Sequence, residues 1–166
     1  MTGLTGRVAV VTGAAQGNGK AIAEALSRAG AQVACCDMQA DSLAATVAGI
    51  TAAGGRALAV ALDVTDAAQC VAAAAQVREK LGDAGILVNN AGIIRRTPLD
   101  ADTFAADWDA VMAVNATGVM QVSRAFLDQL KATQGAIVNL GSIMSVTAGA
   151  GLSAYAASKG AVLQLT

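Results

Sequence analysis

Apolar residues alternate along the chain between short continuous runs and the wider spacing of a helix face. Arg7–Val11 is a short, mostly apolar run, and Gly17–Ala29 then repeats apolar residues at intervals of three and four. The first pattern is typical of a buried strand, and the second predicts an amphipathic helix. The same succession predicts a strand at Gln32–Cys36 and a helix at Ser42–Ala53, which the glycine pair after it would close.

This alternation continues to the end of the chain. Further strands are predicted at Ala57–Leu62, Ile86–Val88 and Ala136–Leu140, and further helices at Ala67–Leu81, at Thr103–Lys131 and from about Ala154 onward. Strands that are apolar on both faces and alternate with helices indicate a parallel sheet covered on both sides. We therefore predict an α/β fold, a doubly wound parallel sheet, in one domain over residues 1–166.

The last predicted strand would leave an open, apolar edge on this sheet. Proteins usually protect such edges, and no strand is predicted after Ala136–Leu140. The sheet is therefore expected to be incomplete at its C-terminal side. A truncated chain would explain this ending, and so would a partner subunit that covers the edge.

Composition and charge narrow the function classes. The chain has 11 basic and 12 acidic residues, a net charge of -1, with neither sign gathered into a run, so a nucleic-acid or membrane surface is not expected. Neither a targeting segment at the Met1 end nor a membrane-length apolar run is found, which favours a cytoplasmic protein. Because histidine is absent, acid–base chemistry falls to Tyr, Lys, Asp or Glu, and no metal site is expected.

Three cysteines complete the inventory of reactive groups. Cys35, Cys36 and Cys70 are odd in number, and Cys35 and Cys36 would point to opposite faces of one strand. We interpret all three as small buried thiols.

A glycine-rich turn stands directly between the first predicted strand and the first predicted helix. Glycines permit a sharp turn and let the backbone approach a pyrophosphate, which then lies on N–H groups at the positive end of a helix. The turn therefore predicts dinucleotide binding, with a purely structural turn as the alternative. Its residues are Thr12-Gly13-Ala14-Ala15-Gln16-Gly17-Asn18-Gly19, in a G-x-x-x-G-x-G spacing.

Asp37 ends the second predicted strand. A carboxylate there accepts hydrogen bonds from both hydroxyls of an adenosine ribose and repels a 2'-phosphate. No Arg or Lys occurs at Ala14, Ala15 or Met38 to counter that repulsion, so NAD is favoured over NADP. The alternative is an ordinary solvated carboxylate after a strand.

More motifs follow the turn in a definite order. They are Asp37, Asp63-Val64, Asn89-Asn90-Ala91-Gly92, Asn115, Ser142 and Tyr155-Ala156-Ala157-Ser158-Lys159. In this order, which is far more specific than any one motif, the chain resembles the short-chain dehydrogenase/reductase family. The resemblance implies a Rossmann-type fold and an NAD-dependent enzyme that interconverts an alcohol and a ketone.

The resemblance also implies roles for the middle motifs. In the family the residue matching Asp63 meets the adenine amino group and Val64 lies beside the ring, while the segment with Asn90, Ala91 and Gly92 stabilises the sheet and lines the cofactor. Without the family, Asp63 would be interpreted as a helix cap and the Asn pair as a turn. Asn18 departs from the family, which usually has an apolar residue there, and the family's two further strands and substrate-covering segment are absent.

Tyr155 and Lys159 are the candidate acid–base pair. Tyr155 is the only tyrosine, and Lys159 follows it at i+4 on a predicted helix, so the two side chains share a face. A free phenol, with a pKa of about 10, is a poor base at neutral pH, but a nearby ammonium stabilises the phenolate. The family also has Lys159 bind the nicotinamide ribose. An ordinary helix pair is the alternative.

Ser142 and Asn115 complete the predicted catalytic set. Ser142 follows the fifth predicted strand, at the edge where ligands of parallel sheets collect, and the family has it hold the reacting oxygen beside Tyr155. Asn115 lies inside the long predicted helix, where Asn has poor propensity. The family places it on a water-linked proton path that ends at Lys159. The alternative is a buried Asn bonded only to nearby backbone.

Arg95 is the candidate substrate-binding residue beside Ser142 and Tyr155. Its guanidinium matches a planar carboxylate, and Ile93-Ile94-Arg95-Arg96 resembles the sugar-acid dehydrogenases of the family, such as those acting on gluconate or keto-deoxygluconate. The alternative, which the sequence supports equally, is that Arg95 and Arg96 are simply solvated loop residues. Family members commonly form homodimers or homotetramers through the last two helices. The alternative function is a dinucleotide-binding module without turnover.

Overall fold

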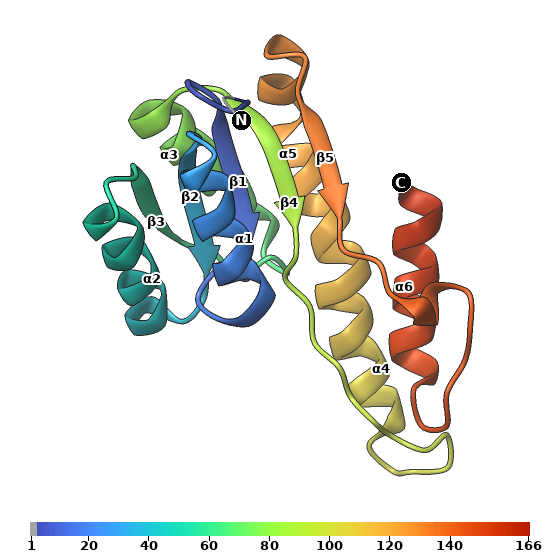
Figure 1. The fold of residues 1–166 in the computed structure, drawn as a ribbon. Coiled ribbons are helices and arrows are strands. Elements are labelled where there is room, and N and C mark those ends of the chain that lie inside the picture. The colour runs from blue at the N-terminus through green and yellow to red at the C-terminus, as the bar shows by residue number, and fades with distance from the viewer. Residues whose placement is uncertain (1–2) are drawn as a thin grey trace.

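Five apolar strands form one parallel sheet in the computed structural model, which describes residues 3–166 (Figure 1). Residues 1–2, part of the stretch inspected for a targeting signal, lie outside the described residues. The strands are β1 (Val8–Thr12), β2 (Gln32–Asp37), β3 (Ala57–Ala61), β4 (Ala84–Asn89) and β5 (Ala136–Asn139).

The strand order is β3-β2-β1-β4-β5, and every neighbouring pair is parallel. The chain therefore moves outward from β1 to β3 and then crosses back to place β4 on the other side of β1. This reversal is the mark of a doubly wound sheet. The predicted α/β, Rossmann-type fold is confirmed.

Helices connect the strands and cover both faces of the sheet. Val8 and Val10 of β1 contribute to the core beneath α3 and α5, whereas Ala9 and Val11 contribute to the core beneath α1 and α2. Such a division follows from the two-residue period of a strand. The helices are α1 (Gly17–Arg28), α2 (Ala40–Ala52), α3 (Ala67–Leu81), α4 (Phe104–Met112), α5 (Gly118–Ala132) and α6 (Ser153–Leu165).

The cysteines follow the same division. Cys35 lies in the core on the α1 and α2 side, and Cys36 and Cys70 lie in the core on the α3 and α5 side. All three are free and buried, as predicted. Burial raises the pKa of the Cys35 thiol to about 12, so this group stays protonated at neutral pH.

The long helix predicted at Thr103–Lys131 needs a correction. A π-helical turn at Ala113–Thr117 separates α4 from α5, although the backbone keeps right-handed helical dihedrals on both sides of the turn. Figure 1 accordingly shows α4 and α5 as one long helical path. A π turn inserts a residue without ending the helix, so the apolar spacing did not reveal it. Asn115 lies within this turn.

Several strand boundaries differ from the prediction by one or two residues, and the largest difference is at the start of β4. β4 begins at Ala84, two residues before the predicted Ile86, because Gly85 takes part in the strand. A Cβ on Gly135 would lie 2.5 Å from the Gly85 carbonyl oxygen, so two backbones approach closely here and glycine serves packing rather than a turn. After β5, the unpredicted 3-10 turn Ile143–Ser145 leads toward α6.

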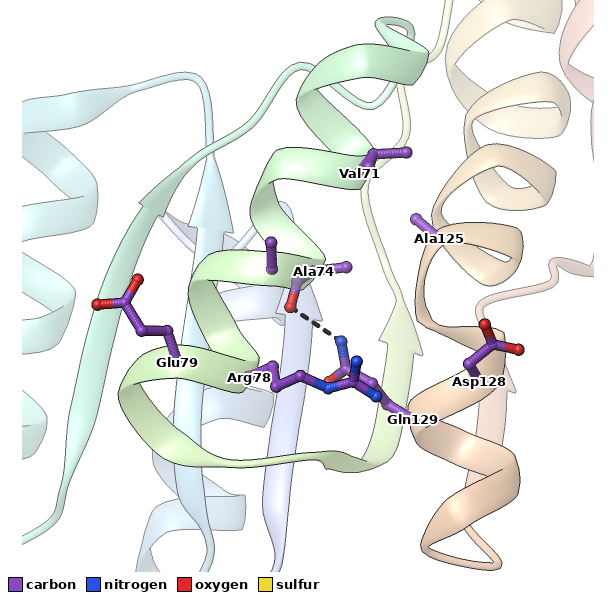
Figure 2. Close-up of a pocket in the computed structure, with 8 residues that line it drawn as sticks. Val71, Ala74, Arg78, Glu79, Ala125, Asp128 and Gln129 are labelled. Atoms are coloured by element: carbon purple, nitrogen blue, oxygen red, sulfur yellow. Dashed lines mark hydrogen bonds between the residues drawn. The ribbon is translucent and has the colours of Figure 1, made fainter.

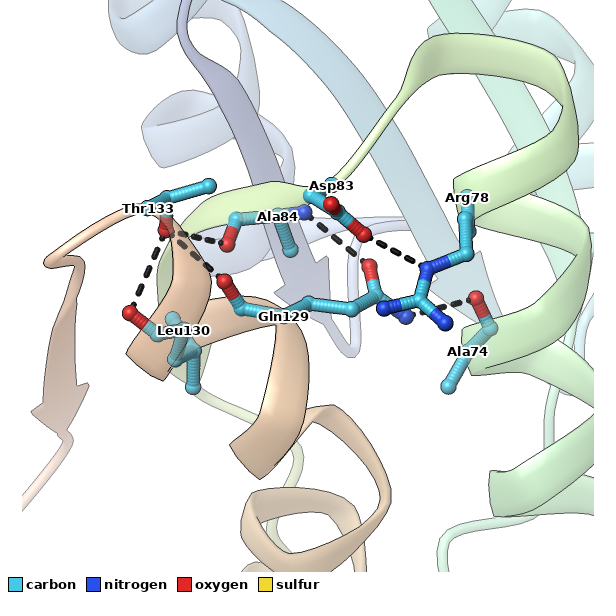
Figure 3. Close-up of polar contacts among 7 residues, drawn as sticks. All are labelled: Ala74, Arg78, Asp83, Ala84, Gln129, Leu130 and Thr133. Carbon is cyan, nitrogen blue, oxygen red and sulfur yellow. Dashed lines mark hydrogen bonds and ion pairs between the residues drawn. The ribbon is translucent and has the colours of Figure 1, made fainter.

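A buried glutamine fastens the start of β4 to the helices on that face (Figure 3). The side chain of Gln129 on α5 accepts a hydrogen bond from Ala84 N at 3.0 Å and donates one to Ala74 O on α3 at 2.9 Å. An ion pair between Arg78 and Asp83, with its nearest atoms 2.6 Å apart, closes the same corner. Gln129 is only 4% exposed, so these bonds are shielded from water.

β5 forms an open edge. Ile137 is 37% exposed and Val138 is 50% exposed, and within residues 3–166 only β4 pairs with this strand. The expectation that the sheet is incomplete at its C-terminal side is therefore confirmed.

Gln129→Met is expected to lower the free energy of unfolding by about 2 to 4 kcal/mol, because the variant leaves a buried N–H and a buried carbonyl without partners. Equilibrium unfolding in urea, followed by circular dichroism, measures the loss. Asp128→Asn, at the exposed neighbouring position, is the control and should stay within about 0.5 kcal/mol of the parent. An unchanged midpoint for Gln129→Met would show that the corner contributes nothing.

Candidate functional site

The glycine turn lies at the carboxyl end of β1, where α1 begins. Gly13 has a φ of 67° and Gly17 a φ of 55°, values that other residues seldom adopt. A Cβ on Gly19 would lie 2.0 Å from the Gly13 carbonyl oxygen, so α1 packs directly on the turn. A Cβ on Gly17 would meet nothing within 4 Å, so this part of the backbone faces open space.

The first amides of α1 are open to an anion. Gln16 occupies the position before the helix, and its side chain makes no capping hydrogen bond. The leading N–H groups of a helix have no partner within the helix, and together they attract negative charge. The turn thus has both the space and the donors that a pyrophosphate requires.

Asn90 locks this turn to β4. Its Nδ2 donates to Thr12 O at 2.9 Å and to Gly13 O at 3.2 Å. In return, Thr12 Oγ1 accepts hydrogen bonds from Asn90 N at 3.1 Å and from Ala91 N at 3.0 Å. The ends of β1 and β4 are therefore held together at the point where the strand order reverses.

Asp37 is held in one orientation at the end of β2. Its Oδ2 accepts a hydrogen bond from Ala15 N at 3.0 Å, and its Oδ1 accepts one from Gln39 N at 3.0 Å. Each carboxylate oxygen keeps a further lone pair, so the group can still accept bonds from a ligand.

A cleft of about 580 Å³ runs along the carboxyl ends of β1, β2 and β4. This volume is within the usual range for small-molecule sites, about 300 to 1,000 Å³. The side chains that line it include no Arg or Lys among the described residues. Its lining contains these predicted cofactor residues: Gly13, Gln16, Asn18, Gly19, Asp37, Asp63, Val64, Asn90, Ala91 and Gly92.

Sequence reasoning missed other residues of the cleft. Met38, Gln39, Leu62, Ile93 and Val114 also line it. Most of these are apolar residues beside a predicted motif, and nothing in their spacing distinguishes them from core positions.

Asp63 is not the cap of α3. Its Oδ1 accepts hydrogen bonds from Thr65 N at 2.9 Å and Thr65 Oγ1 at 2.7 Å, which form a local turn. Asp66 caps α3 instead, by accepting from Ala68 N and Gln69 N. These amides also hold the pKa of Asp66 below its ordinary value. The interpretation of Asp63 as a helix cap is therefore wrong.

Lys159 and Tyr155 lie one helical turn apart on α6. Lys159 is 6% exposed, and its Nζ donates to Leu140 O at 2.6 Å. The same nitrogen lies 5.8 Å from the centre of the Tyr155 ring. Burial lowers the pKa of Lys159 from its ordinary value of 10.5. A shielded amine is thus fixed between the end of β5 and the phenol.

Asn115 links this helix to the cleft. Its Oδ1 accepts from Ile93 N at 2.8 Å, and its Nδ2 donates to Ile93 O at 2.9 Å and to Ser158 Oγ at 3.0 Å. Ser158 Oγ in turn donates to Tyr155 O at 2.7 Å. The partners of Asn115 are distant in sequence, so the alternative that it bonds only to nearby backbone is wrong. Ser158 was not assigned a role from the sequence, although it lies three residues after Tyr155.

Ser142 begins the 3-10 turn that packs against α6. Its Oγ accepts a hydrogen bond from Met144 N at 3.1 Å, and Ser145 Oγ accepts one from Ser142 N at 3.2 Å. Ser145 is thus a capping hydroxyl of this turn. The Ser142 hydroxyl, which accepts in this contact, still has a proton to donate.

Arg95 lies outside the lining of the cleft and pairs with a carboxylate of the chain itself. Its Nε is 3.8 Å from Asp107 Oδ1, and the Arg95 side chain is 57% exposed. Asp107 Oδ2 also accepts from Thr97 Oγ1 at 2.6 Å, and Thr97 N donates to Gly151 O at 2.8 Å. The loop is therefore fastened at Thr97, while Arg95 stays at the surface.

A second hollow, of about 320 Å³, lies between α3 and α5, away from the predicted site residues (Figure 2). Its apolar lining is mostly alanine. Two of its polar side chains, Arg78 and Gln129, already serve the contacts at the start of β4. No predicted cofactor or catalytic residue lines this hollow.

Comparison with known proteins identifies the family of the chain. The family model described as short chain dehydrogenase matches residues 7–166. The chain belongs to the short-chain dehydrogenase family. Within this match lie the glycine turn, the Tyr155 and Lys159 pair and the doubly wound sheet described above.

Several members of the family are similar over nearly the whole chain. Gluconate 5-dehydrogenase of Gluconobacter oxydans is 38% identical over 164 residues, which cover 98% of this chain and 64% of the relative. D-threitol dehydrogenase of Mycolicibacterium smegmatis is 40% identical over 157 residues, which cover 94% of this chain and 60% of the relative. The chain therefore spans less than two thirds of the length of these relatives.

Solved structures agree with the sequence comparison. The structure of a gluconate 5-dehydrogenase from Burkholderia cenocepacia J2315, in complex with NADP and tartrate, matches with a TM-score of 0.92 and 39% identity. The match covers 98% of this chain and 64% of that one. Within residues 3–166 of this short-chain dehydrogenase, no helix has both the length and the apolar character to span a bilayer.

Lys159→Met is expected to change how stability depends on pH. The folded chain releases the Lys159 proton at lower pH than the unfolded chain, so between those two pKa values the unfolded chain holds more protons. The parent therefore gains stability relative to Lys159→Met as pH rises toward 10.5, by at most about 1.4 kcal/mol per pH unit.

Urea unfolding at several pH values above neutrality measures this difference. Lys131→Met removes an exposed lysine from α5 and reports the general effect of losing one positive charge. The free energy of unfolding of the parent minus that of Lys159→Met should grow with rising pH. A difference that fell instead would contradict the assignment of Lys159 as a buried residue whose charged form is disfavoured.

Proposed function

We propose that this chain is the cofactor-binding and catalytic part of an NAD-dependent oxidoreductase that interconverts a secondary alcohol and a ketone. The family to which the chain belongs consists of oxidoreductases, and its relatives are named as dehydrogenases of sugar acids and polyols. One observation carries the proposal. A buried amine, Lys159, lies beside the only phenol, Tyr155, on a helix that Asn115 joins to the cleft.

The residues around the cleft fit a nicotinamide dinucleotide. The open space before Gly17 and the uncapped start of α1 suit the pyrophosphate, and Asp37 suits the adenosine ribose. By the family pattern, Asp63 and Val64 would hold the adenine, and Asn90, Ala91 and Gly92 would lie along the rest of the cofactor. When bound, the nicotinamide supplies the hydride acceptor.

The protein's own part in the reaction is to orient the substrate and move a proton. In our proposal, Tyr155 takes the hydroxyl proton during oxidation and returns it to the carbonyl oxygen during reduction. Ser142 has a proton to donate to the reacting oxygen, and the Lys159 ammonium stabilises the phenolate. Lys159 would also bind the nicotinamide ribose. Asn115 keeps its predicted place on a water-linked proton path to Lys159.

We propose NAD rather than NADP as the cofactor. The Asp37 carboxylate lines the cleft, and within residues 3–166 no Arg or Lys side chain lines the cleft to offset its repulsion of a 2'-phosphate. The similar gluconate 5-dehydrogenase structure was solved in complex with NADP, so likeness of fold does not support the choice of NAD. Local charge around Asp37, rather than the fold, is what supports our choice.

Two named relatives and the surface beside the cleft support a substrate class. We propose a sugar acid, a polyol or a similar secondary alcohol, with Arg95 binding a carboxylate when the substrate has one. Its present contact with Asp107 is long and exposed, so a ligand can compete for the guanidinium. We also propose that the enzyme is cytoplasmic and that it forms a homodimer or homotetramer through α4, α5 and α6.

Tyr155→Phe is expected to reduce alcohol oxidation by about a thousandfold, because the general base is lost while the ring remains. The assay follows NADH absorbance with a panel containing gluconate, threitol and related alcohols, and NADH affinity is measured alongside. Affinity for NADH should not change. Equal turnover by the variant and the parent would remove Tyr155 from the chemistry. A parent that bound NADH but turned over no member of the panel would instead support the module without turnover.

Asp37→Ala is expected to narrow the preference of the protein for NADH over NADPH by about tenfold or more, corresponding to about 1.4 kcal/mol. The variant removes both the acceptor for the ribose hydroxyls and the charge that repels a 2'-phosphate. Dissociation constants for both nucleotides give the ratio. Asp41→Ala removes an exposed carboxylate from the first turn of α2 and is the matched control. A ratio unaffected by Asp37→Ala would contradict the assignment.

A further inference from the structure

A buried hydroxyl on α2 contacts the glycine turn from behind. Thr46 is fully buried, and its Oγ1 lies 3.2 Å from Ala15 O and 3.1 Å from Ser42 O. The contact with Ser42, four residues earlier, is ordinary for a threonine inside a helix. The contact with Ala15 is different, because it joins α2 to the turn between β1 and α1 across 31 positions.

The contact with Ala15 is not needed to satisfy Thr46 itself. Ser42 O alone would accept the hydroxyl proton, and a valine would fill the same space in the apolar core around Leu43 and Ile50. Ala15, in contrast, is 4% exposed, and a buried carbonyl without a donor is costly. The geometry thus gives the Thr46 hydroxyl a role toward Ala15.

The backbone of Ala15 is also held by Asp37, through the N–H of the preceding peptide group. Ala15 N donates to Asp37 Oδ2 at 3.0 Å, and Thr46 reaches the Ala15 carbonyl oxygen. Ala14 N also donates to Cys36 O at 3.1 Å, so this part of the turn stays close to the end of β2. The two contacts therefore fix the peptide groups on either side of the Ala15 Cα, so the backbone dihedrals of Ala15 are constrained from both sides. A change in those dihedrals would release the carboxylate of Asp37 from one of its two backbone donors.

We propose that Thr46 is a positioning residue for recognition of the adenosine ribose. Thr46 does not line the cleft. It acts on the orientation of Asp37 through the backbone of Ala15, whose carbonyl it binds and whose N–H binds Asp37. In that way Thr46 sets part of the discrimination between dinucleotides with and without a 2'-phosphate. This inference rests on the proposed function, because it presupposes that the cleft binds a nicotinamide dinucleotide.

The test measures dissociation constants of NADH and NADPH for the whole chain by isothermal titration calorimetry. Thr46→Val removes the hydroxyl at nearly constant volume and is expected to weaken NADH binding about fivefold, the equivalent of one hydrogen bond, with a smaller effect on NADPH. Thr46→Ser keeps the hydroxyl and should restore the parent's ratio of the two constants. Thr46→Ala offers the same test should valine not be accommodated in the fold.

A double variant separates positioning from a general structural effect. In the Asp37→Ala background, Thr46→Val is expected to cause no further loss of NADH affinity, because the group on which it acts is gone. An additive loss, or equal weakening of NADH and NADPH, would overturn the inference. A parent that binds neither nucleotide removes the proposed function and this inference together. If Asp37→Ala changed the ratio of the NADH and NADPH dissociation constants and Thr46→Val did not, only the inference about Thr46 would fail.

Discussion

The hydrogen bonds between Asn90, Thr12 and Gly13 are the constraint on which the rest of the site depends. Parallel strands that wind outward in two directions leave a crevice at the point of reversal, and here that point lies between β1 and β4. Without a fixed joint, the glycine turn after β1 and the loop after β4 would move separately. The Asn90 side chain donates to two carbonyls at the turn after β1, and Thr12 Oγ1 accepts from two amides after β4, so the two walls of the cleft have one geometry.

Buried polar groups on the α5 side extend this constraint through the fold. Gln129 fixes where β4 begins, and Asn115 ties the loop after β4 to α6. Each has partners for its amide, so the desolvation cost of burying it is met by hydrogen bonds. Lys159 is different, because burial disfavours its charged form. The stability lost at that position is consistent with a group retained for chemistry rather than for folding.

Sequence reasoning succeeded where a signal was local. The period of apolar residues located the five strands and most helix ends, and glycine spacing located the turn, because both reflect constraints within a few residues. It failed where contacts between residues distant in the sequence determine the structure. The strand predicted from Ile86 begins at Ala84, because it includes Gly85, on which Gly135 packs. The partners of Asn115 come from a loop and a helix distant in the chain. Thr46 gave no signal, since a threonine within an apolar helix pattern is unremarkable. The catalytic role proposed for the Tyr155 and Lys159 pair rests on the order of the family motifs, which neither the apolar period nor the composition contains.

The π turn between α4 and α5 has a consequence for insertions and deletions. Each residue turns a helix by about 100°, so the extra residue at Ala113–Thr117 changes which side α4 presents relative to α5. This lets α4 pack against α6 while α5 packs against α3 and β4. Loss of one residue here would rotate those faces out of phase, even where every remaining side chain was kept. In this segment, therefore, the number of residues sets the relative orientation of the two helices independently of which side chains those residues carry.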